Sequence, residues 1–135
     1  MRRSALALLS LSTLALTGCG PTAEDIQAMV DGSARAYDDA LALREDVVDA
    51  GVPCPGTDQL SAPDDPETTF LDCTNGHMGM AVAGSDEEME GFLNTLGSRG
   101  RIPFLHAANW VVISPDEARL EQLQDELGGE LSTNP

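Results

Sequence analysis

The pattern that most constrains the fold occurs twice in the second half of the chain: two short strand-like runs, a turn between them, and a helix start after them. In the first copy, a β-prone run at residues 68–71 precedes Asn75-Gly76, a dipeptide typical of hairpin turns. Residues 77–83 then form the return strand. Ser85-Asp86-Glu87-Glu88 has the pattern of a capping box, so a helix is expected to begin there and to end at Gly97.

The second copy has the same order. Residues 102–106 can form a strand, and Ala108-Asn109 is expected to turn the chain into residues 110–113, its most apolar strand. Ser114-Pro115-Asp116-Glu117 supplies an N-cap, a proline at the first helical position and an acid at the third. Gly128-Gly129 is expected to end the helix. The two copies therefore predict two ββα units.

Upstream of these units, apolar residues recur at helical spacing from residue 24 to about residue 50, where Gly51 and Pro53 would stop a helix. The expected fold is α+β: a long N-terminal helix, then ββα-ββα. The strands make a four-stranded antiparallel sheet with the helices on one face, in an order that the sequence leaves open. Residues 24–131 are expected to form a single domain and residues 132–135 a frayed tail.

The charge of the chain excludes one large class of partners. Its 135 residues contain 23 acids against seven basic residues, all arginine, for a net charge of −16. Such a chain repels phosphate backbones, so no nucleic acid is expected among its partners.

The N-terminus has the parts of an export signal. Arg2-Arg3 precedes an apolar run at residues 5–16, which is too short for a transmembrane helix of about 20 residues. The run ends in Leu16-Thr17-Gly18-Cys19, which resembles the lipobox of bacterial lipoproteins. The resemblance implies a signal peptide at residues 1–18, diacylglycerol and palmitate on Cys19, and a short tether at residues 19–23. The expected location is the extracytoplasmic side of the cell membrane, held by the lipid.

Two more cysteines, Cys54 and Cys73, remain for a disulfide in that oxidising compartment. The bridge would brace residues 53–67, which are proline-rich and poor in apolar groups. Zinc binding is the alternative, but no further Cys or His lies at ligand spacing.

A second resemblance covers most of the mature chain. The lipobox, a helix, Cys54 and Cys73 around a Pro/Asp-rich loop, Asn109-Trp110-Val111-Val112 and Leu127-Gly128-Gly129 together look like small lipoproteins of high-GC Gram-positive bacteria. That resemblance implies an extracytoplasmic location and no particular activity.

Several residues could bind metals. Met78 and Met80, with His77 beside them, are soft ligands suited to Cu(I), but in a strand His77 points to the opposite face, and paired methionines are common in cores. His77 with His106 would make an incomplete site. Two acidic clusters could suggest calcium, at residues 64–67 and 86–90, but neither has the pattern of a calcium loop. No cofactor is expected.

No catalytic motif is present in the sequence, so we do not expect an enzyme. Arg99 and Arg101, in a glycine-rich loop, could contact an anionic ligand or partner, with Trp110 nearby. The sequence therefore predicts a lipid-anchored extracytoplasmic protein with a small binding or scaffolding domain, whose partners are the membrane, through Cys19, and another envelope protein. The alternative is an envelope lipoprotein that handles copper or calcium.

Overall fold

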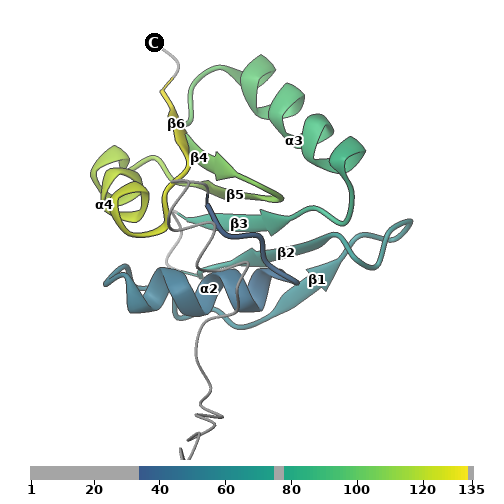
Figure 1. Ribbon diagram of the computed structural model, residues 1–135, viewed down its shortest axis with the longest axis horizontal. Helices are drawn as coiled ribbons and strands as arrows, with labels where there is room; N and C mark the ends of the chain where they lie inside the picture. The colour runs from purple at the N-terminus through teal and green to yellow at the C-terminus, as the bar shows by residue number, and fades with distance from the viewer. Residues whose placement is uncertain (1–33, 75–77, 134–135) are drawn as a thin grey trace, which may run out of the picture.

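The computed structural model describes residues 34–74 and 78–133, which form an α+β domain of three helices and a six-stranded antiparallel sheet (Figure 1). In chain order the elements are α2 (Ala40–Asp49), β1 (Gln59–Ser61), β2 (Thr69–Asp72), β3 (Gly79–Val82), α3 (Asp86–Arg99), β4 (Phe104–Ala107), β5 (Trp110–Ile113), α4 (Glu117–Leu127) and β6 (Glu130–Ser132).

The strand order in the sheet is β1-β2-β3-β5-β4-β6. Each predicted strand pair is present: β2 pairs with β3, and β4 pairs with β5 across the predicted turn at Ala108-Asn109. The other predicted turn, Asn75-Gly76, lies outside the described residues. The two pairs join through β3 and β5, where Met80 faces Val112 and Ala81 faces Val111.

The sheet has two more strands than predicted. β1 pairs with the outer side of β2, and β6 pairs with the outer side of β4, so each hairpin gains one short edge strand. Neither edge strand has the apolar alternation that marks a strand in the sequence; each exists because it completes the hydrogen bonding of its neighbour. Ser132, expected as the first residue of a frayed tail, is therefore the last residue of β6.

The helices cover both faces of the sheet, not one (Figure 1). α2 and α4 pack on one face, over the larger core, which includes Trp110, Leu105 and Val112. α3 packs alone on the other face, over a smaller core that includes Ala81 and Val111. Both faces are covered because the two central strands, β3 and β5, carry apolar side chains on both sides. Each face of the sheet must therefore be shielded from water by a helix.

The predicted long N-terminal helix is also wrong within the described residues. Residues 34–39 are irregular, and α2 begins at Ala40, with the Asp39 side chain accepting a hydrogen bond from the Ala42 amide at 2.8 Å. Residues 24–33 lie outside the described residues. The chain before α2 is held by the β4–β5 turn: the Trp110 indole donates a hydrogen bond to the Arg35 carbonyl at 2.8 Å.

Two helix ends differ from prediction by a few residues. Ser85 is the N-cap of α3 as expected, but the helix continues through Gly97 to Arg99 and ends at Gly100, whose φ is +61°. For α4 the N-cap is Asp116, not Ser114. The residues of both cores lie between residues 34 and 131, so this part of the chain supplies the apolar side chains that pack on each face of the sheet.

Candidate functional site: an apolar groove beside α3

An open apolar groove of about 540 Å³ lies between α3 and the sheet. Strands β1, β2, β3 and β5 form its floor, and the second half of α3 forms one wall. The lining residues are Asp58, Leu60, Phe70, Leu71, Asp72, Thr74, Gly79, Met80, Ala81, Phe92, Thr95, Leu96, Val111 and Ile113. Sites that bind drug-sized molecules typically enclose roughly 300–1,000 Å³ and are mostly apolar, so this groove is of suitable size and character.

The groove exists because small residues of β3 face α3. Gly79 and Ala81 present only small side chains to it. Met80 also contributes to the lining, but with Met78 and Val82 it belongs to the larger core on the opposite face. Short side chains under α3 leave space between the helix and the sheet. The helix cannot move closer to fill this space, because its other side chains are already packed against the sheet.

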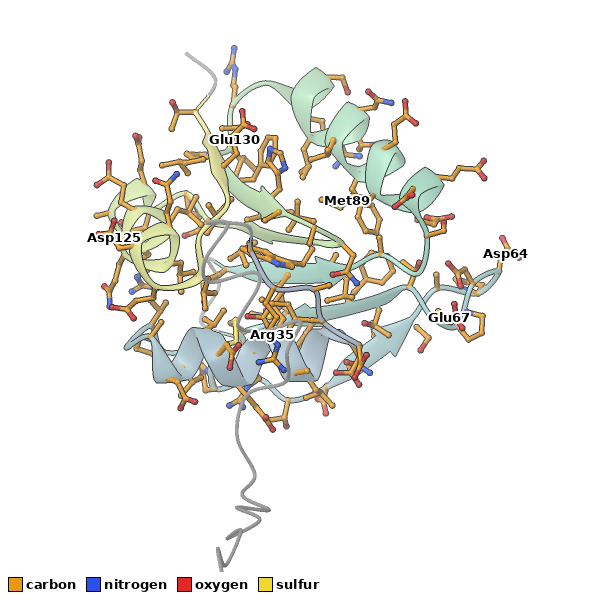
Figure 2. The ribbon with its side chains drawn as sticks, viewed as in Figure 1. Arg35, Asp64, Glu67, Met89, Asp125 and Glu130 are labelled. Carbon is orange, nitrogen blue, oxygen red and sulfur yellow. A yellow bond between two sulfur atoms is a disulfide. The ribbon has the colours of Figure 1, made fainter. Side chains whose placement is uncertain are left out.

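α3 itself is held to the sheet mainly at its first half. Among its residues only Met89 is buried, at 8% exposure, and Figure 2 labels it between α3 and the sheet. Phe92, Leu93 and Leu96 are half-buried, so the apolar stripe of the helix is only partly covered. The second half of α3 therefore presents apolar surface to the groove.

Across the groove, one aromatic contact connects the helix to the sheet. The rings of Phe70 on β2 and Phe92 on α3 meet edge to face, with centroids 5.7 Å apart. Beside them Leu60 is 70% exposed and Phe70 is 37% exposed. These two residues are direct partners on neighbouring strands, so they form a contiguous apolar patch at the open side of the groove.

The two charged residues of the lining are both carboxylates, Asp58 and Asp72, at the end where β2 leads into the disulfide. The side chain of Asp72 accepts a hydrogen bond from the Thr74 amide at 2.7 Å. Next to it Cys73 is bonded to Cys54, with an S–S distance of 2.03 Å, which is the predicted disulfide. The bridge joins the segments on either side of β1 and β2, so it fixes the backbone at this end of the groove.

A second hollow, at the start of α2, is polar. Its lining includes Asp38, Asp39, Gln59, Glu67 and Asn109. Several of its polar side chains bond nearby backbone groups: Gln59 accepts a hydrogen bond from the Leu41 amide at 2.9 Å, and Asn109 accepts one from the Tyr37 amide at 3.0 Å. We assign this hollow a structural role at the junction of α2, β1 and the β4–β5 turn.

The predicted basic loop and Trp110 are not brought together. Arg99 and Arg101 are exposed at the end of α3 and after it, whereas Trp110 is completely buried in the core on the opposite face of the sheet. Trp110 is the first residue of β5 and pairs with Ala107, at the end of β4. Phe104, at the start of β4 and nearest to Arg101 in sequence, pairs with Ile113 at the other end of β5. Its indole holds the segment before α2 and is not available to a ligand.

The two methionines proposed as copper ligands are buried. Met78 and Met80 are each 3% exposed and belong to the larger core, and His77 lies outside the described residues. His106 is half-buried beside the ring of Phe104, at a centroid distance of 5.6 Å. Within residues 34–74 and 78–133, no group of three or more His, Cys, Asp or Glu side chains could hold a metal ion.

The acidic clusters have local roles. The Asp65 carboxylate accepts hydrogen bonds from the Thr68 hydroxyl at 2.7 Å and from the Glu67 amide at 3.1 Å, which shapes the turn between β1 and β2. The acids at residues 86–88 occupy the first turn of α3, where negative charge interacts favourably with the helix dipole. In Figure 2, Asp64 lies at the tip of the turn between β1 and β2, and Glu67 lies further back, against Gly84 just before α3.

Cys19 lies outside the described residues. No helix within the described part of the chain is both long and apolar enough to cross a membrane. Comparison with known proteins gives no match to any family model, curated protein or solved structure.

The groove is not among the expectations from the sequence. One signal could have indicated it: the small residues of β3, Gly79 and Ala81, alternate with larger ones. Alternation of small and large residues predicts that one face of a strand carries only small side chains. Only the position of α3 over that face makes it a groove.

Proposed function

We propose that this protein is an exported lipoprotein, anchored by lipid on Cys19 to the extracytoplasmic side of the cell membrane, whose domain binds a small amphiphilic molecule. The observation that carries the binding function is the apolar groove between α3 and the sheet. The anchor and the location rest on the sequence of residues 2–19.

The disulfide supports an extracytoplasmic location. Disulfides form and persist in oxidising compartments and are rare in the cytosol, where thiols are kept reduced. The bridge between Cys54 and Cys73, both of them buried, is therefore in keeping with the proposed location.

The groove supports binding of a small molecule better than a purely scaffolding role. Its floor is continuous apolar surface from Leu60 to Ile113, and its wall carries Phe92 and Leu96. Covering such surface removes apolar area from water, which stabilises a complex by about 25 cal/mol per Å² before the costs of binding. The half-buried helix and the exposed Leu60 leave this surface accessible from one side.

The anchor is tested by Cys19→Ser in the full chain expressed in a bacterium that processes lipoproteins. The wild-type protein is expected to take up radiolabelled palmitate and to enter the detergent phase of a phase-separation assay. The variant is expected to do neither. Palmitate labelling of the Cys19→Ser variant would overturn the anchor.

The groove is tested with a neutral fluorophore, N-phenyl-1-naphthylamine, and the variant Thr95→Phe. Thr95 is exposed and lines the groove, so a phenyl ring there should occupy the site and lower affinity about tenfold or more. Asn94→Phe adds the same ring to the neighbouring exposed position, which does not line the groove. Equal affinity in the two variants would overturn the assignment of the site.

A further inference from the structure

We propose that the groove selects amphiphiles with a cationic head group, which sits at Asp58 and Asp72 while the apolar body lies against β2, β3 and α3. This inference rests on the proposed binding function and adds to it the charge of the ligand.

The first observation is the position of the two carboxylates. Gln59 on β1 pairs with Leu71 on β2, so continuing the same register by one residue sets Asp58 against Asp72. Both lie two residues from the partners Leu60 and Phe70, and therefore on the same face of the sheet as that apolar patch. One end of the groove is thus acidic, and the apolar surface runs away from it.

The second observation is that this arrangement opposes local stability. Like charges that face each other on neighbouring strands are destabilising, and both side chains are exposed acids. Within the part of the chain that the structure describes, no arginine lines the groove: Arg99 and Arg101 follow in sequence at the end of α3 but are not among its lining residues. Asp72 accepts a hydrogen bond from the Thr74 amide, but the described lining contains no cationic side chain to offset the two negative charges, and a local conflict of this kind is typical of a functional site. A cation between the two carboxylates would remove the conflict.

The net charge of the whole chain also favours a cationic ligand. The chain has a net charge of −16, which attracts cations to the surface and repels anions. A fatty acid or other anionic amphiphile would place its carboxylate beside Asp58 and Asp72. A second copy of the chain would bring two acidic rims together. A small cationic amphiphile satisfies both the apolar floor and the acidic end.

The test compares three ligands that share a decyl chain and differ in the head group: decyltrimethylammonium, decyl maltoside and decanoate. Each is titrated below its micelle concentration into the chain from Gly20 to Pro135, which retains every residue of both cores. The expected result is a dissociation constant about tenfold lower for the cation than for decanoate at low salt, with a difference that shrinks as salt screens the charges.

The double variant Asp58→Asn, Asp72→Asn is expected to lose this preference. Asparagine keeps a carbonyl oxygen that can accept the Thr74 amide, so the local turn is preserved. The matched control is Glu121→Gln, Asp125→Asn, which removes two exposed acids from α4, on the opposite face. The single variant Asp58→Asn leaves Asp72 intact and is expected to lose part of the preference.

The outcomes separate the two proposals. Similar affinities for all three decyl ligands would overturn the cationic selectivity and leave groove binding standing. An equal loss of preference in the α4 control would also overturn it, because net charge alone would then explain the result. No binding of any decyl ligand would overturn both proposals.

Discussion

Asn109 and Tyr37 lie 72 residues apart in the chain and are joined by two hydrogen bonds. The Tyr37 amide donates to Oδ1 of Asn109 at 3.0 Å, and Nδ2 of Asn109 donates to the Tyr37 carbonyl at 2.7 Å. A side-chain amide thereby pairs with the backbone of an irregular segment as a neighbouring strand would. With the bond from Trp110 to Arg35, it fixes the approach to α2.

Replacing Asn109 by alanine should therefore destabilise the domain by about 2–3 kcal/mol, because it leaves the amide and carbonyl of Tyr37 without partners in a half-buried place. The measurement is urea denaturation followed by circular dichroism. Asn94→Ala, at an exposed position of α3, is the control and should leave the free energy of unfolding nearly unchanged. Equal stability of the two variants would contradict a tethering role for Asn109.

Gly56 should tolerate no side chain, since it lies against the backbone beside the disulfide. A Cβ there would fall 2.1 Å from the Asp72 carbonyl oxygen, and the Gly56 amide donates a hydrogen bond to the Cys73 carbonyl at 3.2 Å. Gly56→Ala must shift the backbone at the acidic end of the groove, and we expect a loss of about 2 kcal/mol or more.

Gly91→Ala is the matched substitution in open space. Its Cβ would have no neighbour within 4 Å, and alanine in a helix is more stable than glycine by about 0.5–1 kcal/mol. Thermal denaturation should move the two variants in opposite directions. A Gly56→Ala variant as stable as the wild type would contradict the close approach.

Alkaline pH should destabilise the domain through Tyr37. Burial raises the pKa of its hydroxyl well above the ordinary value near 10, and the hydrogen bond to Asp46, 2.7 Å long, adds to the shift. Because the folded state holds this proton more tightly, the stabilisation is complete below pH 10. It is lost as pH rises above 10, where the unfolded chain ionises first.

The composition makes that prediction unusually specific. The chain has one tyrosine and no lysine, and arginine does not titrate in this range. The free energy of unfolding, measured between pH 9 and 11.5 on residues 20–135, should fall above pH 10 by up to about 1.4 kcal/mol per pH unit. Tyr37→Phe should remove the slope, and a slope that persists in this variant would contradict the assignment.

Met78, just before β3, and Met80, within it, should have no role in metal binding. Both sulfurs belong to the larger core, so the double variant Met78→Leu, Met80→Leu should keep any Cu(I) affinity of the wild type unchanged. Leucine is close to methionine in volume, and the expected cost is below about 1.5 kcal/mol per site. Native mass spectrometry with added Cu(I) provides the measurement. A bound ion that disappears in a well-folded double variant would favour the metal-handling alternative.

The sequence by itself determined the local elements. The Ser85 cap, the turn at Ala108-Asn109 and the alternation of Met78, Met80 and Val82 each depend on neighbours a few residues away, so each could be inferred without the fold. The disulfide could be inferred as well, because the expected lipidation of Cys19 would leave Cys54 and Cys73 as the available pair.

Only the tertiary structure decided the edge strands, the helix faces and the groove. β1 and β6 exist through pairing with β2 and β4, which no local pattern encodes. The irregular course of residues 34–39, just before α2 begins at Ala40, is held by Asn109, far along the chain, whose side chain bonds the backbone of Tyr37. The groove requires α3 to lie over the small residues of β3, and Asp58 lines the same groove as Asp72 only because β1 pairs with β2. Contacts between residues distant in sequence decide these features. The spacing of apolar residues along the chain carries information only about residues that are close together in sequence.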